Sequence, residues 1–281
     1  MRTYVQTKGD IGGLQAVSDA VKAVEMVAAS HIHRLRKAAL SLEEYVIELR
    51  QMLGEFTSYH AIGDNPLLRR KTDGEAMLIV VIGDRGLVGG LYNEIISELG
   101  RIRGRYGRII VVGGRGDRLM REEGMRPERT LPAPSDLMTG AESAAISDFA
   151  LTEFEGGRAR SVDVLYSKFV TLAVQRPHVS AFLPFEMGDV PAADAEPGIP
   201  IFEPSKRHVA DELLRRYIGM FFSAILSEAK LSEFAARTVA MEHAGSQADD
   251  EVRKVTLRYF KERRRDISRK QIESFFAHKA L

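Results

Sequence analysis

The chain has 281 residues, of which 44% are hydrophobic, and 40 Lys and Arg against 39 Asp and Glu. This length suits one or two domains with a real core, and a net charge of +1 gives the whole chain no strong field for nucleic acid or a membrane surface. The absence of cysteine excludes disulfides, thiolate metal sites and cysteine nucleophiles, and no apolar run approaches the ~20 residues that a membrane-spanning helix needs.

An unbroken seven-residue repeat marks the amino-terminal segment. Its apolar members are Leu14, Val21, Ala28, Leu35, Leu42, Leu49 and Phe56. A companion row is expected three residues further on, at Val17, Val24, His31, Ala38, Tyr45 and Met52. A strict repeat of this kind keeps one seam facing a partner helix, and no Pro interrupts residues 11–65. Residues 1–65 are therefore predicted to form one long helix that needs a partner of similar length.

The middle of the chain, residues 66–204, alternates short apolar runs with helical segments. Strands are expected at 76–82, 108–112, 161–169 and 178–185, and helices at 92–106, 117–123 and 141–154. Residues 131–135 contain two prolines and are predicted as loop, and the Pro-, Gly- and acid-rich stretch 189–204 as the link to the last helix. Alternating strands and helices predict a mostly parallel open sheet, and so a Rossmann-like α/β domain.

Two glycine-rich turns follow these strands and invite a nucleotide-binding interpretation. The first, at 86–90, lacks the phosphate-loop spacing because no Lys or hydroxyl residue follows Gly90. The second, at 114–116, lacks the third glycine of the dinucleotide fingerprint, whose place Leu119 takes. We therefore expect structural turns, and no catalytic set, cofactor or metal site is predicted. The residues expected to shape the first turn are Asp84, Arg85, Gly86, Gly89 and Gly90.

The carboxyl-terminal segment, residues 205–281, supplies the partner helix. Apolar residues recur in it at helical spacing, and no Pro lies between 209 and 276. Residues 253–270 carry nine Lys and Arg against Glu262 and Asp266, which is either a solvated face or a contact for acidic loops of a partner. The predicted fold is a long antiparallel coiled coil of the two terminal helices, with the α/β domain inserted between them.

Three separate segments resemble the gamma subunit of F-type ATP synthase. Residues 22–30, Lys-Ala-Val-Glu-Met-Val-Ala-Ala-Ser, are similar to the family's Lys-Ala-Met-x-Met-Val-Ala-Ala box, and residues 84–91 to its Ser-Asp-Arg-Gly-Leu-Cys-Gly-Gly-Leu-Asn turn. Residues 232–241, Ser-Glu-Phe-Ala-Ala-Arg-Thr-Val-Ala-Met, resemble the Ser-Glu-x-Ala-Ala-Arg-Met-x-Ala-Met box. The matches follow the family's order and comparable spacings across nearly the whole chain.

Several positions depart from the family pattern and mark a divergent member. Val24 stands in place of the family's Met, and Tyr92 in place of its Asn. Gly83 stands where the family has Ser or Thr, Val88 where it has Cys, and Arg264 where it has Gln.

The resemblance implies the rotary shaft of an ATP synthase at the cytoplasmic face of a bacterial inner membrane. The terminal helices would lie inside the hexamer of alpha and beta subunits, which would carry the ATP chemistry. The α/β domain would contact the epsilon subunit and the membrane c-subunit ring, and no nucleic acid is expected as a partner. Hexamer contacts are implied for Val24, Met26, Arg237, Arg263, Arg264 and Ser268, and contacts of the lower domain with the ring for Phe202 and Glu203.

Two other functions stay open at this point. A nucleotide-using α/β enzyme with coiled-coil dimerisation arms has the same outline, and so has an adaptor whose helices scaffold other proteins. Nucleotide binding by the isolated chain would favour the enzyme.

Overall fold

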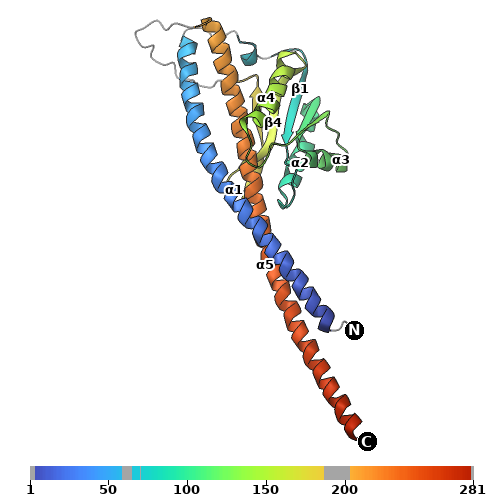
Figure 1. Cartoon of the computed structure of the whole chain (residues 1–281). Coiled ribbons are helices and arrows are strands. Elements are labelled where there is room, and N and C mark those ends of the chain that lie inside the picture. Colours follow the sequence, from blue (N-terminus) through green and yellow to red (C-terminus); the bar gives the residue numbers. More distant parts are fainter. Residues whose placement is uncertain (1–3, 59–64, 70, 187–202, 280–281) are drawn as a thin grey trace. The chain divides into compact units, whose positions relative to one another are not determined.

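The computed structural model describes residues 4–58, 65–69, 71–186 and 203–279, and most of the predicted link at 189–204 lies outside them. The chain divides into two compact units, residues 1–28 with 237–281 and residues 29–236, and each is described by itself. The elements in chain order are α1 (Tyr4–Ser58), η1 (Pro66–Leu68), β1 (Glu75–Val81), α2 (Leu91–Ile102), η2 (Arg103–Arg105), β2 (Arg108–Val112), α3 (Gly114–Glu122), β3 (Arg129–Leu131), α4 (Gly140–Glu155), β4 (Ala159–Phe169), β5 (Gln175–Leu183) and α5 (Lys206–Lys279) (Figure 1).

The sheet belongs to the unit of residues 29–236. Its strand order is β3-β2-β1-β4-β5, with parallel pairing everywhere except between β4 and β5. The predicted mostly parallel sheet is confirmed. The strand β3 was not predicted, because it has only three residues, two of them exposed, and so leaves no pattern beside the loop expected at 131–135.

Apolar layers cover both faces of the sheet. Leu78 and Val80 of β1 face a cluster built with α2 and α3. Met77 and Ile79 face a second cluster, built with α4 and with parts of α1 and α5. This two-sided burial explains why the strand is a continuous apolar run instead of an alternating one.

The α4 helix is fixed at both ends by carboxylates. At its start Thr139 and Glu142 form a capping box. The backbone N–H groups of Thr139 and Ser135 lower the pKa of Glu142 to about 2. At its end Glu153 accepts hydrogen bonds from Arg158 at 2.8 and 2.9 Å and from Arg108 at 2.7 Å. These bonds, with that from Arg158 the strongest, lower the pKa of Glu153 to about 2.

The terminal helices pair antiparallel in the unit of residues 29–236. Near residue 29, where this unit begins, His31 of α1 stacks on Phe234 of α5, with ring centroids 4.5 Å apart. Further along α1, Leu49 and Leu53 pack in the same apolar cluster as Leu214, which lies earlier on α5. Later residues of α1 thus pack near earlier residues of α5, so the two helices run antiparallel.

The same antiparallel order holds in the unit of residues 1–28 and 237–281, where polar groups pair between the helices and the apolar residues Ala28, Met241 and Val255 are also buried. The hydroxyl of Thr7 donates a hydrogen bond of 2.7 Å to Glu262. Ser18 donates to Asp249 at 2.6 Å, and Lys22 forms an ion pair with the same carboxylate at 2.8 Å. Hydrogen bonds from Lys22 and then Ser18 lower the pKa of Asp249. The predicted fold class, an antiparallel coiled coil with an inserted Rossmann-like domain, is confirmed.

The companion row of the seam differs from the prediction. Val17, Tyr45 and Met52 are 54%, 37% and 49% exposed, whereas Ser18 and Leu53, one residue further along, are 3% and 0% exposed. At Ser18 and Leu53 the buried companion therefore lies four residues after the first row instead of three, whereas His31 of the predicted row is half-buried and stacks on Phe234. Helix positions three and four residues away both adjoin a given residue, so the repeat alone does not decide which side faces the partner helix.

Candidate functional site

The turn after β1 links the sheet to two helices. Leu87 and Gly89 have positive φ values of 64° and 56°, and Gly90 caps the start of α2 at φ −84°. Asp84 accepts a 2.6 Å hydrogen bond from the backbone N–H of Gly114, so its carboxylate caps α3. The turn is thereby fixed to the first residue of a neighbouring helix.

Other predicted turn residues are held by side chains beyond the turn. Arg85 forms an ion pair with Asp136. A Cβ on Gly86 would lie 3.1 Å from Nη1 of Arg115, which is a tight but not impossible approach. These contacts anchor the turn to residues that follow it in the chain.

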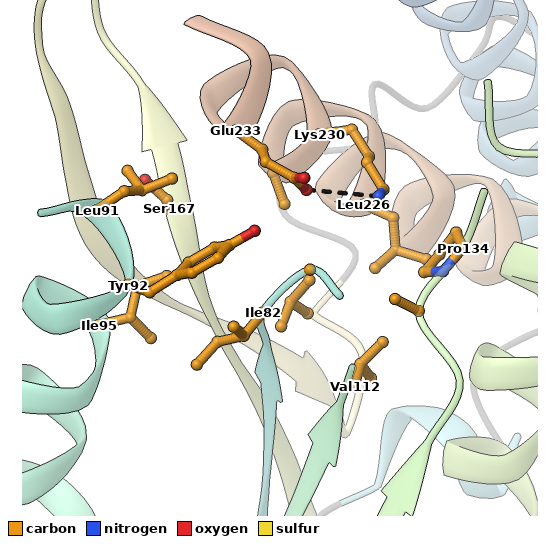
Figure 2. Close-up of a pocket in the computed structure, with 14 residues that line it drawn as sticks. Ile82, Leu91, Tyr92, Ile95, Val112, Pro134, Ser167, Leu226, Lys230 and Glu233 are labelled. Carbon is orange, nitrogen blue, oxygen red and sulfur yellow. Dashed lines mark hydrogen bonds and ion pairs between the residues drawn. The ribbon is translucent and has the colours of Figure 1, made fainter. Parts of the chain in front are cut away.

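A small cavity lies at the carboxyl ends of the strands (Figure 2). Its volume of about 20 Å³ is enough for one water molecule. In doubly wound sheets this edge is where ligands bind, at the point where the strand order reverses; here that point lies between β1 and β4. The α5 helix supplies one wall of the cavity. The lining residues are Val81, Ile82, Gly83, Leu91, Tyr92, Ile95, Val112, Ala133, Pro134, Ser167, Leu226, Ala229, Lys230 and Glu233.

Two opposite charges of α5 are buried at this cavity. Nζ of Lys230 lies 3.4 Å from Oε2 of Glu233, and the two residues are 7% and 4% exposed. Buried charges persist only when they are paired and hydrogen-bonded, since removing one partner leaves an uncompensated charge. Figure 2 shows the Tyr92 hydroxyl pointing toward Glu233, whose carboxylate faces Lys230.

Further polar contacts fasten α5 to the sheet and to α4. The hydroxyl of Tyr166 on β4 donates a 2.8 Å hydrogen bond to Glu228 of α5. Burial first, and then this carboxylate, raise the pKa of Tyr166. The hydroxyls of Ser143 and Ser223 lie 2.7 Å apart in the interior. The contacts of α5 in this unit are therefore specific as well as apolar.

The residues expected to contact a hexamer differ in their exposure. Met26 is 69% exposed and Arg237 is 6% exposed, while Arg263, Arg264 and Ser268 are exposed on α5. Val24 is half-buried. Of the two residues expected at the ring, Phe202 lies outside the described residues and Glu203 is exposed just before α5.

Part of the basic run is neutralised on its own helix. Asp266 binds Arg269 at 2.9 Å and Lys270 at 3.0 Å. The hydrogen bond from Lys270 is the main cause that lowers the pKa of Asp266. Arg263, Arg264 and Arg265 are exposed on the same stretch of helix.

Sequence reasoning did not single out the cavity residues as a site. Glu233 and Tyr92 lie inside segments that resemble the family, but nothing in the sequence indicated that Lys230 and Ser167 line the same cavity. The available signal was a Lys and a Glu three residues apart within an apolar stretch of helix, a spacing that places both on one face. Their meeting with Tyr92 depends on the tertiary fold.

Comparisons with known proteins agree over nearly the whole chain. Residues 5–274 match the ATP synthase family. The ATP synthase gamma chain of Roseiflexus sp. is 31% identical over 94% of this chain and 93% of its own length. That of Symbiobacterium thermophilum is 28% identical over 92% and 91%.

Solved structures share the fold at low sequence identity. The rotor of the Euglena gracilis mitochondrial ATP synthase superposes with a TM-score of 0.66 at 17% identity, covering 94% of this chain and 98% of that one. A chain of the central stalk and c-ring of the Tetrahymena thermophila enzyme gives 0.57 at 19% identity, covering 80% and 99%. Paired terminal helices, an inserted Rossmann-like sheet and full-length sequence similarity lead to one conclusion: this chain belongs to the family of ATP synthase gamma chains.

Proposed function

We propose that the chain is the central-stalk rotary shaft of an F-type ATP synthase. In this role it couples ion flow through the membrane ring to ATP synthesis or hydrolysis in the catalytic hexamer. The observation that carries the proposal is the family match over residues 5–274, which includes both terminal helices and the inserted domain.

The chain itself is proposed to be non-catalytic. A bound nucleotide requires a pocket of roughly 300 Å³ or more, whereas the cavity at the carboxyl edge of the sheet has about 20 Å³. Lys230 and Glu233 of α5 occupy the place where an α/β enzyme would hold its ligand. This packing disfavours the alternative of a nucleotide-using enzyme with dimerisation arms.

The proposed partners are the alpha and beta subunits, the epsilon subunit and the c-subunit ring. One Euglena gracilis structure with a matching chain is an assembly of F1 and c-ring, and the Tetrahymena thermophila one contains a central stalk and c-ring. Among the described residues no helix is both long and apolar enough to cross a membrane. We propose that the chain is held peripherally, at the cytoplasmic face of a bacterial inner membrane.

The contact residues follow from this assignment. Met26, Arg263, Arg264 and Ser268 are exposed and are proposed to touch the hexamer directly. Val24 and Arg237 are half-buried and buried, so they are proposed to act by positioning the surface around them. Lower contacts with the ring are proposed for the segment that contains Phe202 and Glu203.

Purification of the tagged full-length chain from its host tests the assignment. We expect alpha, beta, epsilon and c subunits to co-purify, and ATP hydrolysis to depend on the presence of the beta subunit. In parallel, titration of the isolated chain with ATP or NAD should show no binding at micromolar concentration. Micromolar affinity, or purification without any ATP synthase subunit, would reject the proposal.

A further inference from the structure

At the cavity on the carboxyl edge of the sheet, two buried polar side chains approach the backbone of Gly83 closely. A Cβ built on Gly83 would lie 2.5 Å from the Tyr92 hydroxyl and 2.5 Å from Oε2 of Glu233. Both oxygens therefore converge on the space that a side chain at position 83 would need. Real Cβ contacts are not this short, so any larger residue at this position must displace both groups.

Neither group can move aside easily. Tyr92 and Glu233 are each 4% exposed, and Tyr92 packs in the apolar cluster that includes Ile82, Leu91 and Ala236. Glu233 is paired with Lys230, which is 7% exposed. Moving the Glu233 carboxylate would lengthen an ion pair in a poorly solvated place, where an unpaired charge is strongly unfavourable.

Gly83 and Tyr92 are therefore matched to one another. The Tyr92 hydroxyl ends in the space that a side chain at residue 83 would need. The glycine and the tyrosine are thus compatible together, whereas exchanging either one alone creates a clash or a void.

We propose that Gly83, Tyr92, Lys230 and Glu233 form a buried lock that fixes the axial and rotational position of α5 on the carboxyl edge of the sheet. The side chain of Tyr92 comes from α2 and the ion pair from α5 (Figure 2). Ser167 of β4 also lines the cavity, and its buried hydroxyl has no hydrogen-bond partner among the described residues. The lock rests on the proposed function for its purpose: it would pass torque between the α/β domain and the shaft helix.

The first test is a double-mutant cycle in the full-length chain. Gly83→Ser should lower Tm by about 4 °C or more, because its side chain displaces Tyr92 and Glu233. Tyr92→Asn alone should also lower Tm, because it leaves a void. The variant with both changes should recover part of the loss caused by Gly83→Ser, since the smaller Asn removes the contact with the residue at position 92 while the contact with Glu233 remains.

A matched control lies in the same turn. A Cβ on Gly90 would meet nothing within 4 Å, so Gly90→Ser should leave Tm within about 1 °C of the wild type. Hydrogen exchange of residues 222–236 gives the local readout: we expect at least about tenfold faster exchange in Gly83→Ser and not in Gly90→Ser. Equal behaviour of the two serine variants, or simple addition of the losses in the double variant, would overturn the lock.

The ion pair is tested separately. Lys230→Met keeps the length of the side chain but leaves Glu233 without its cation, and Glu233→Gln does the reverse. Each should accelerate exchange of residues 222–236, and the variant with both changes should exchange more slowly than the faster single variant. A neutral effect of Lys230→Met would remove the ion pair from the lock.

The proposed role of the lock in passing torque is tested in the reassembled ATP synthase. We expect Gly83→Ser to lower the ratio of ion transport to ATP hydrolysis at least about twofold, and Tyr92→Asn added to it to restore part of the ratio. An unchanged ratio in a variant whose α5 exchanges faster would overturn the torque role. If the wild-type chain failed to assemble with ATP synthase subunits, the proposed function would fall, while the cycles in the isolated chain would still decide the lock.

Discussion

Single residues decide which side of α1 faces α5. Of the first row of the repeat, Ala28, Leu35 and Leu49 are buried, and Leu14, Val21 and Leu42 are half-buried. At two places the second row lies one residue further along than predicted: Ser18 and Leu53 are buried instead of Val17 and Met52. Both registers satisfy the same heptad, because Leu and Met are equally acceptable in a seam, and the choice was set by packing against the α/β domain.

A pair of truncations at neighbouring positions checks this register. Leu53→Ala should lower the free energy of unfolding by roughly 2–5 kcal/mol, because it leaves a cavity in the core. Met52→Ala, at a position that is 49% exposed, should change it by less than about 0.5 kcal/mol. Denaturant unfolding of both variants gives the comparison, and a larger loss at Met52 would reinstate the predicted row.

The turn after β1 depends on one glycine more than on its neighbours. Gly89 has φ 56°, a conformation that a β-branched residue resists. Gly89→Val should therefore cost about 1–3 kcal/mol of stability, with Gly89→Asn closer to the wild type. Thermal unfolding would show this order, and a Val variant as stable as the Asn variant would contradict it.

At the scale of elements, α4 is held at both ends by carboxylates that must stay ionised. The pKa values of Glu142 and Glu153 are both lowered from 4.5 to about 2. A lowered folded-state pKa contributes stability that is present above the unfolded value. That contribution is lost as the pH falls from about 4.5 toward 2.

Replacing one of these carboxylates should weaken the dependence of the free energy of unfolding on pH below 4.5. Glu153→Gln removes charged hydrogen bonds to Arg158 and Arg108 and should cost about 2 kcal/mol at pH 7. Between pH 4.5 and 2 the variant should lose less stability than the wild type, because one of the coupled protonations is gone. Chemical denaturation across this range is the measurement; parallel curves for the two proteins would show that Glu153 plays no part.

How far each element could be predicted depended on its length. The long helices have a helical repeat and the strands β1, β2 and β4 contain apolar runs, whereas β3 has three residues and depends on its hydrogen bonds to β2. The predicted turn could be located but not its partners: the pairing of Asp84 with Gly114 joins residues 30 positions apart. The lock residues were the least predictable, because Tyr92 and Lys230 line the same cavity only after α5 has packed on the α/β domain.

At the scale of the whole molecule, the assignment as a rotary shaft gives the basic end of α5 a purpose. Arg263 and Arg264 are exposed, while Arg269 and Lys270 both pair with Asp266 on the same helix. Each exposed ion pair with a partner would contribute only about 0.2–1 kcal/mol. Single substitutions should therefore have mild effects.

A combined Arg263→Ala and Arg264→Ala change should reduce coupled ATP hydrolysis in the reassembled complex. Folding of the isolated chain should be unaffected, because both side chains are exposed. Arg269→Ala and Lys270→Ala together serve as the matched control, since these two charges are already paired with Asp266. Full activity and unchanged salt sensitivity of the Arg263 and Arg264 variant would reduce the run to a solvated helix face.

The antiparallel seam also has a consequence for the order of folding. The hydrogen bond between Thr7 and Glu262 joins residues 255 positions apart, and closing so long a loop in a disordered chain is slow and entropically costly. Folding of residues 29–236 first would bring the two chain ends together and leave only a short loop to close. We expect refolding to protect the amides of β1 and β4 before those around Ser18 and Asp249, which pulsed hydrogen exchange would resolve. The terminal segments would then pair progressively, beginning with the residues next to the folded unit of residues 29–236 and ending at the chain ends.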